Sequence, residues 1–239
     1  KRLGAHTGGI IAEQGRPTTV KTRIIADHRQ QVVRYDHEEC KEASPASRKK
    51  LLDYLTGNCD GAAALIISDY AKGAVPNALL KQLLQWARAK KMLVCTDHPN
   101  LHNYDLYKNR VTVITPNKKE AAQLSGIEIE NEKTLIKAGR TALARLGCQA
   151  VLITRGEDGM SLFQGKRATH IPTKAKEVYD VTGAGDTVIA TLTMALVAGA
   201  SFEEAAMIAN HAAGIVVSKL GTATASPGEL IESIRNDPL

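Results

Sequence analysis

Gly183, Ala184, Gly185 and Asp186 combine three very small side chains with one carboxylate. The β-favouring stretch 178–182 precedes them, and an apolar helical stretch follows. A helix N-terminus exposes unpaired backbone N–H groups and the positive end of its dipole, which together attract phosphate. Asp186 would repel that phosphate unless it serves a second reactant, for example by accepting the proton of an attacking hydroxyl. The alternative is that Asp186 only complements the helix dipole.

Two common phosphate-binding loops do not fit these residues. A Walker A loop requires a lysine directly before its Ser or Thr, and Asp186 precedes Thr187 here. A dinucleotide fingerprint begins correctly at Gly183 and Gly185, but Val188 stands where its last glycine should be. We therefore predict a phosphate site of another kind.

The composition indicates a globular protein. Of the 239 residues, 44% are hydrophobic and 23% are charged, so the chain can bury a core. The formal net charge is +6, but the Lys and Arg residues are scattered and only two Phe and one Trp are present. This pattern favours small phosphorylated substrates over nucleic acid. No apolar stretch reaches the ~20 residues that span a bilayer.

Cysteine and histidine spacing gives no metal or disulfide pattern. The four cysteines, Cys40, Cys59, Cys95 and Cys148, form no C-x-x-C pair, which favours a cytoplasmic protein over a disulfide framework or a zinc ribbon. His98 and His102 lie in a Pro/Asn-rich loop without a clear third ligand, so we interpret them as loop residues.

Apolar runs of strand length alternate with helical patterns along most of the chain. The runs are residues 63–68, 92–96, 111–115 and 150–154. Because they are apolar on both faces, they predict an α/β fold with a mostly parallel sheet and helices on both sides. Two hairpins are predicted, at 19–36 around a polar turn at 27–30, and at 160–172.

Capping residues mark several helix ends. Gly126 and Gly147 are typical of helix C-termini. Two consecutive helices follow Asp186: Gly199 ends the first, and Ser201 with Glu204 forms a capping box for the second. The second is expected to stop near Gly221. We interpret residues 1–239 as one domain.

Polar side chains follow the predicted strands, where each strand ends. Asp69 and Lys72 come after the first strand, Asp97 after the second, Asn117 and Glu120 after the third, Arg155 after the fourth, and Asp180 after a fifth at Val178–Tyr179. Ligands in open α/β folds bind at the edge where parallel strands finish. The sequence therefore predicts an active site there.

Three separated motifs, "TPNKKE", "TRGEDG" and "DVTGAGDT", occur in the order found in ribokinase-like carbohydrate kinases, and the chain resembles that family from about Thr19 onward. Within the family, "LIISDYAKGAV", "VLITRGEDGMSLF" and "KEVYDVTGAGDTVIA" are most similar to the kinase domain of bifunctional heptose kinase–adenylyltransferases. The resemblance implies a ribokinase-like fold with a small β-hairpin lid. It also implies ATP-dependent phosphorylation of the anomeric hydroxyl of D-glycero-β-D-manno-heptose 7-phosphate, in ADP-heptose and lipopolysaccharide core synthesis. Alternatives are another sugar or nucleoside as substrate, or a nucleotide-binding remnant without turnover.

The resemblance also implies roles for individual residues. Asp186 matches the catalytic base, and Gly183, Ala184 and Gly185 match the anion hole. The nucleotide-binding positions are Asn117, Lys118, Lys119, Glu120, Thr154, Arg155, Gly156 and Asn210. Glu120 would hold Mg²⁺ through water, and Asp180 with Thr182 falls where many relatives hold a monovalent cation such as K⁺. Asp69, Lys72, Lys21 and Arg23 are weaker candidates for the sugar phosphate.

Structural alternatives accompany several of these roles. Asn117 and Glu120 are also spaced as a helix capping box. Arg155 could pair with Glu157 or Asp158 at the surface. Lys21, Arg23 and Lys72 could be solvated charges.

The chain departs from the family pattern at its N-terminus. Relatives begin with a strand that ends in a sugar-binding aspartate, followed by a Gly-Gly-Ala-Asn-like segment, and this sequence starts downstream of both. We therefore expect a truncated kinase domain whose sugar binding is incomplete. The hairpin 19–36 resembles the lid through which relatives dimerise, and Val20, Ile24, Val32 and Tyr35 could supply the apolar face of a homodimer.

Overall fold

The computed structural model describes residues 4–26, 31–97, 104–175 and 177–237. The predicted turn at 27–30 and both His98 and His102 lie outside the described residues. The chain divides into two compact units. The first unit comprises Lys1–Gly61 and Ala71–Leu83, and the second comprises Ala62–Tyr70 and Leu84–Leu239. The single-domain organisation stays a prediction.

The first unit contains the predicted hairpin. Strands β1 (Val20–Ile25) and β2 (Gln31–His37) pair antiparallel, with Ile24 opposite Val33 and Thr22 opposite Tyr35. Helix α1 (Pro45–Asn58) begins at Ser44, whose side chain accepts a hydrogen bond from Ser47 N at 3.2 Å. The hairpin prediction is confirmed.

The second unit is built on a six-stranded sheet. In spatial order its strands are β3 (Ala64–Ser68), β4 (Leu93–Asp97), β5 (Val113–Ile114), β6 (Ala150–Thr154), β7 (Met160–Gln164) and β8 (Arg167–Ile171). The first four are parallel, and β6, β7 and β8 pair antiparallel in turn. The mostly parallel sheet and the hairpin at 160–172 are thereby confirmed.

The remaining helices are α2 (Asn77–Ala89), which runs from the first unit into the second, α3 (Tyr104–Tyr107), α4 (Lys118–Ser125), α5 (Glu132–Leu146), α6 (Ala184–Val197), α7 (Phe202–Val217) and α8 (Pro227–Asn236). Gly126 and Gly147 end α4 and α5 in the left-handed conformation, as the sequence predicts. The capping box of Ser201 and Glu204 is present, although α7 ends at Val217 rather than near Gly221.

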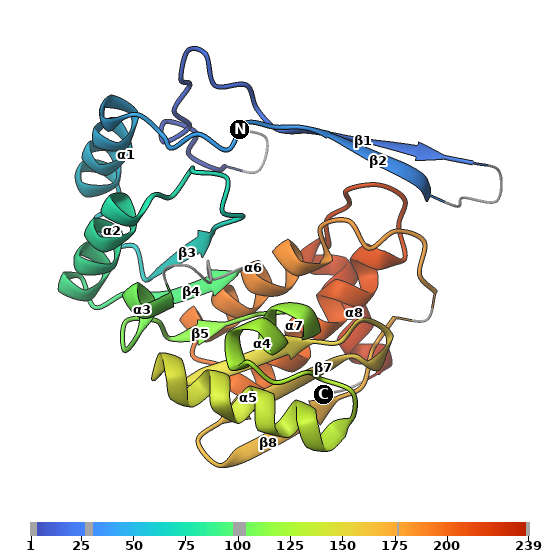
Figure 1. Cartoon of the computed structure of the whole chain (residues 1–239). Helices are drawn as coiled ribbons and strands as arrows, with labels where there is room; N and C mark the ends of the chain where they lie inside the picture. The colour runs from blue at the N-terminus through green and yellow to red at the C-terminus, as the bar shows by residue number, and fades with distance from the viewer. Residues whose placement is uncertain (1–3, 27–30, 98–103, 176, 238–239) are drawn as a thin grey trace. The chain divides into compact units, whose positions relative to one another are not determined.

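Helices cover both faces of the sheet. Figure 1 shows α4 and α5 on one side of it and α6 and α7 on the other. On the second side, Leu152, Leu162 and Cys95 are buried against Leu192 and Ala209. Each fully buried Leu contributes about 1.5–3 kcal/mol relative to exposure. This packing fixes where α6 begins relative to the strand ends.

The predicted strand at Val178–Tyr179 is wrong. Residues 177–183 form no strand, and Val178 and Val181 are 60% and 68% exposed. The backbone N–H groups of Tyr179 and Asp180 donate instead to the carbonyl of Val217, the last residue of α7. The β-favouring side chains have no neighbouring strand to pack on, so tertiary context overrides their propensity.

Candidate active site

The N-terminus of α6 carries no side-chain cap. Helices α1, α4, α5, α7 and α8 each begin at a Ser or Asn whose side chain accepts a backbone N–H. Helix α6 begins at Gly183, which has φ 84° and ψ 1° and no side chain to accept a hydrogen bond. Only glycine adopts this left-handed conformation without strain. Ala184 N donates to Val181 O at 3.2 Å, but no side chain of the cap residue occupies the other amides of the first turn, which suit an anion.

Asp186 lies in the first turn of α6 and is exposed. The Tyr70 hydroxyl donates a hydrogen bond to its Oδ1 atom at 3.3 Å. Tyr70 follows the end of β3, so a residue from the sheet edge meets the predicted base. An exposed carboxylate beside uncapped helix amides can accept a proton from a hydroxyl bound there.

Asp97 is a neighbour of this loop for which the sequence suggested no specific role. It ends β4, is 2% exposed, and accepts a hydrogen bond from Thr115 Oγ1 at 3.3 Å. A Cβ atom on Gly185 would lie 3.9 Å from Asp97 Oδ2. The sequence analysis named it only as one of the polar residues that follow the apolar strands.

Asp69 is buried, with 3% exposure, at the end of β3. Its backbone N–H donates to Asp97 O at 3.4 Å. Two causes raise the pKa of the Tyr107 phenol: burial is the larger, and the charge of the nearby Asp69 carboxylate is the second. Asp69 thus lies in the protein interior close to Tyr107, and its role toward a sugar stays a prediction.

Asn117 and Glu120 form the capping box that the sequence offered as an alternative. Asn117 Oδ1 accepts from Glu120 N at 3.0 Å, and Asn117 N donates to Glu120 Oε2 at 2.9 Å. Asn117 also forms a β-bridge with Thr154. The box is confirmed, and it fixes both side chains at the start of α4 beside the Thr154 loop. Their ligand role stays a prediction.

Lys118 and Arg155 line one hollow of about 430 Å³, together with Asp158, Asn131 and His170. Lys118 Nζ lies 2.9 Å from Asp158 Oδ2, and Arg155 Nη2 lies 3.9 Å from the same atom. Arg155 Nη1 also donates to the Ser161 hydroxyl at 3.0 Å. The predicted surface pair with Asp158 is therefore present, while the guanidinium still borders the hollow.

Other predicted residues are held elsewhere. Lys119 lines a second hollow along α4, which Lys118 also borders. Asn210 is buried on α7 and donates to Pro172 O at 2.6 Å. Asp180 Oδ1 accepts from Thr182 N at 2.9 Å, which brings the two predicted cation ligands together in one loop.

The chain matches the pfkB family carbohydrate kinase model over residues 3–228. It belongs to the pfkB family of carbohydrate kinases. It is 43% identical over 232 residues to the bifunctional protein HldE of Geobacter sulfurreducens and 44% identical to that of Geotalea uraniireducens. Each alignment covers 97% of this chain and 47% of the relative, so the chain spans about half the length of these proteins.

Solved structures show the same fold. Ribokinase from Giardia lamblia has a TM-score of 0.75 at 18% identity, with 93% of this chain and 72% of that chain covered. Phosphofructokinase-2 from Escherichia coli in complex with potassium has a TM-score of 0.73 at 18% identity, with 85% and 66% covered. The ribokinase-like α/β fold is thereby confirmed, and this pfkB-family protein is a phosphotransferase.

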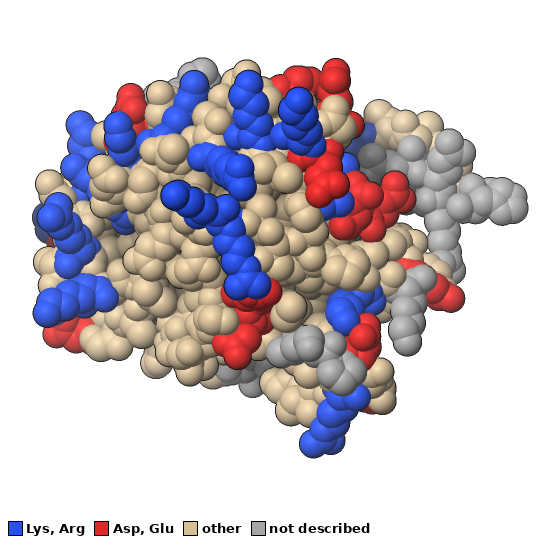
Figure 2. Space-filling model, turned by 90° about the horizontal axis from the view of Figure 1, so that it is seen from below, with Lys and Arg blue, Asp and Glu red and all other residues tan. Residues whose placement is uncertain are grey.

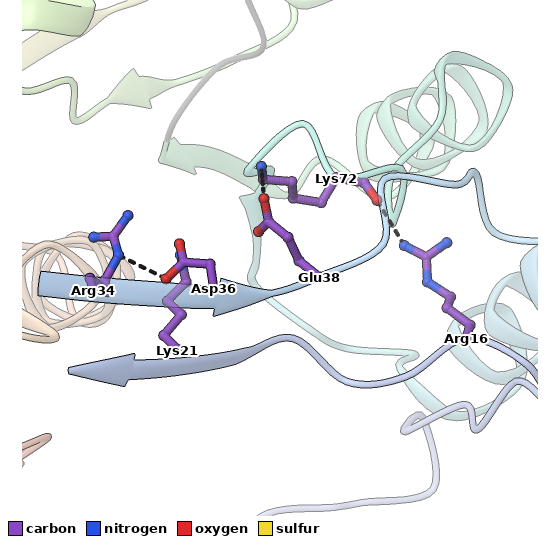
Figure 3. Close-up of polar contacts among 6 residues, drawn as sticks. All are labelled: Arg16, Lys21, Arg34, Asp36, Glu38 and Lys72. Carbon is purple, nitrogen blue, oxygen red and sulfur yellow. Dashed lines mark hydrogen bonds and ion pairs between the residues drawn. The ribbon is translucent and has the colours of Figure 1, made fainter. Parts of the chain in front are cut away.

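The sugar-phosphate candidates Lys72 and Lys21 of this kinase have acidic partners in the first unit. Figure 3 shows Lys72 paired with Glu38, while Arg16 donates to the Lys72 carbonyl at 3.0 Å. Lys21 lies 3.5 Å from Asp36, which Arg34 also contacts at 2.9 Å. Arg23 is exposed and lies opposite Arg34 in the hairpin register. Their substrate roles stay predictions.

One residue on the apolar face of the hairpin differs from the prediction, because Val33 stands there in place of Val32. Val33, opposite Ile24, is 48% exposed, and Tyr35, opposite Thr22, is 64% exposed. Cross-strand partners share a face, so Val33 joins Ile24 and Tyr35 there. Val32 is the extra residue beside the register shift between Ile24 and Ile25.

Kinases of this family use ATP and Mg²⁺. Within the described ranges, no three His, Cys, Asp or Glu side chains are grouped to hold a metal. Mg²⁺ commonly uses one or two carboxylates together with water and substrate phosphates, so Glu120 near the Thr154 loop fits a nucleotide-borne ion.

None of the helices in the described part of the chain is both long and apolar enough to cross a membrane. Figure 2 shows Lys and Arg side chains spread over much of one face, with Asp and Glu side chains among them.

Proposed function

We propose that this chain is the kinase part of a heptose 7-phosphate kinase, which transfers the γ-phosphoryl group of ATP to the anomeric hydroxyl and yields the 1,7-bisphosphate. The supporting observation is the exposed Asp186 carboxylate in the first turn of the uncapped helix α6. Segments of the chain resemble heptose kinase domains, and relatives of the chain at 43–44% identity are HldE proteins. Another sugar or nucleoside is the alternative substrate.

Asp186 acts as the general base in this proposal. The sugar O1 attacks the γ-phosphorus, its proton passes to the Asp186 carboxylate, and the bond to the β-phosphate oxygen breaks to release ADP. A base within hydrogen-bond reach commonly contributes ~10² to 10⁴-fold to such a rate. The rest of the catalysis is positioning and charge neutralisation.

The start of α6 holds the transferred group. Charge on the phosphoryl oxygens grows or shifts during transfer, and preorganised amides stabilise it without reorganisation. Gly183 and Gly185 present no side chain that would keep the phosphate from the backbone. Thr187 N already donates to Gly183 O at 2.9 Å, so the turn is ordered.

The nucleotide phosphates lie toward Asn117, Lys118 and Arg155 in this proposal. Arg155 is restrained by Ser161, so its guanidinium is preorganised to give a forked contact to phosphate. Mg²⁺, when bound with the nucleotide, would neutralise phosphate charge, and Glu120 would hold it through water. Asp180 and Thr182 would hold a monovalent cation.

The test measures the ADP that the intact protein forms from ATP in the presence of each compound of a panel of sugar phosphates and nucleosides. Wild type should turn over heptose 7-phosphate in preference to the panel, and Asp186→Asn should abolish that turnover while ATP affinity changes less than about threefold. Asp105→Asn is the matched control, because Asp105 is also exposed in the first turn of a helix. Preference for another compound would show that this compound, and not heptose 7-phosphate, is the substrate. Undiminished turnover in Asp186→Asn would refute the mechanism.

A further inference from the structure

Tyr70 and Asp186 are 116 residues apart in the sequence, yet their side chains meet. The Tyr70 hydroxyl donates to Asp186 Oδ1 at 3.3 Å. Tyr70 lies two residues beyond Ser68, the last residue of β3, and Asp186 lies in the first turn of α6. Helix α6 packs against β3 and β4. Asp186 is therefore anchored in a packed helix, and Tyr70 follows closely on the end of a strand of the same sheet.

The chain turns sharply just after Tyr70. Ala71 has φ 56°, a left-handed value that a residue with a Cβ atom rarely adopts. The backbone therefore turns away from the strand direction directly after Tyr70, whose hydroxyl contacts Asp186 Oδ1. Such rare backbone conformations persist only where surrounding structure requires them.

The phenol is the donor in this bond. Tyr70 is 51% exposed, and its partial burial, followed by the charges of Asp186 and Asp97, raises its pKa to about 12. Tyr70 therefore keeps its proton near neutral pH, and an ionised carboxylate can only accept. A hydrogen bond from Ser68 acts in the opposite direction on this pKa, because it stabilises the phenolate.

An exposed aspartate at a helix N-terminus can adopt more than one rotamer, and only some of them face a bound hydroxyl. A donor fixed on the sheet edge selects among them. We propose that Tyr70 is a positioning residue that holds Asp186 Oδ1, so that Oδ2 receives the proton of the sugar hydroxyl. This inference rests on the proposed function. The 3.3 Å separation is long for O–H···O⁻, and such bonds commonly tighten when substrate binds.

Tyr70→Phe keeps the ring and removes only the hydroxyl. Single-turnover phosphoryl transfer in the intact protein should slow by about 10- to 100-fold, as expected for loss of a hydrogen bond to a charged group. The KM values for ATP and sugar phosphate should stay within about twofold, because the interaction serves the chemical step rather than binding. Tyr179→Phe is the matched control: its hydroxyl donates to Glu177 Oε2 at 2.6 Å. It should leave the rate unchanged.

Asp186→Asn, measured beside them, separates the two proposals. If Asp186→Asn is inactive and Tyr70→Phe has the wild-type rate, the positioning role is wrong while the base assignment stands. If Tyr70→Phe raises only the KM for the sugar phosphate, Tyr70 contacts substrate and the positioning role is again wrong. If Asp186→Asn remains active, the base assignment fails and the positioning role fails with it. Circular dichroism checks that each variant is folded.

Discussion

Gly185 lies beside Asp97: a Cβ atom on Gly185 would be 3.9 Å from the Asp97 Oδ2 atom. That separation is an ordinary van der Waals contact, so steric space does not require a glycine there. The position is nevertheless in the first turn of α6, where the proposed anion binds. At Gly183, by contrast, the backbone conformation itself favours glycine, since a φ of 84° is unfavourable for a residue with a Cβ atom.

Gly185→Ala should therefore fold at least as stably as wild type, because alanine is favoured over glycine in a helix by up to about 1 kcal/mol. Its turnover should fall, because the methyl group occupies space for phosphate. Gly183→Ala should lose about 1–2 kcal/mol of unfolding free energy through backbone strain. Urea denaturation and ADP release measure the two effects. Full activity in Gly185→Ala would show that no anion approaches this turn.

Asn117 and Ser201 form equivalent capping boxes at α4 and α7. Replacing either by alanine should cost about 0.5–2 kcal/mol of unfolding free energy. If Asn117 also serves the nucleotide, only Asn117→Ala should weaken ATP binding, measured by calorimetry. Equal ATP affinities in the two variants would leave Asn117 with the capping role alone.

Gly139 on α5 faces the ring of Phe163 on β7. An added Cβ atom would lie 2.4 Å from Phe163 Cε2, which is a clash with a buried side chain. Gly139→Ala should therefore cost about 1–3 kcal/mol of stability, despite the better helix propensity of alanine. Gly228→Ala in α8 is the control, because its added Cβ meets nothing within 4 Å beyond its chain neighbours and the backbone of its own helix. A Gly139→Ala protein as stable as Gly228→Ala would contradict the packing of α5 on the sheet.

Three of the four thiols should differ in reactivity according to their burial. Burial raises the pKa of Cys148 to about 12 and also raises that of Cys95, while Cys40 is exposed. Because the thiolate is the reactive form, Ellman's reagent at pH 8 should label Cys40 rapidly and leave Cys95 and Cys148 unmodified until the protein unfolds. Cys40→Ser should remove the fast phase. Rapid labelling of Cys148 in the native protein would contradict its buried place.

Apolar patterning predicted the central strands of the second unit well, because β4, β5 and β6 are almost wholly buried, whereas Ile66 in the edge strand β3 is 41% exposed. Residues 150–154 are buried at four of five positions, and the run reads as continuously apolar. The same signal failed at Val178–Tyr179, where β-favouring residues lie exposed along the end of α7. Capping boxes at Asn117 and Ser201 were readable because each depends on residues three apart.

Contacts distant in sequence were not predictable from single motifs. The motif around Asp186 indicated a base, but nothing in its spacing pointed to Tyr70, 116 residues earlier. Likewise, the pairing of Lys72 with Glu38 depends on how the first unit folds. Residue types and spacing therefore located the candidate site, and the packing of α6 on β3 and β4 determined its neighbours.

The central claim is that amides at the start of α6 hold the transferred phosphoryl group while Asp186 accepts the sugar proton. The most direct measurement is a crystal structure of the intact protein with a non-hydrolysable ATP analogue, Mg²⁺ and heptose 7-phosphate. We predict the terminal phosphate within about 3 Å of the backbone N–H groups of residues 183–186, and the sugar O1 within about 3 Å of an Asp186 oxygen. A terminal phosphate bound away from α6, or an Asp186 carboxylate turned away from the sugar, would contradict the account.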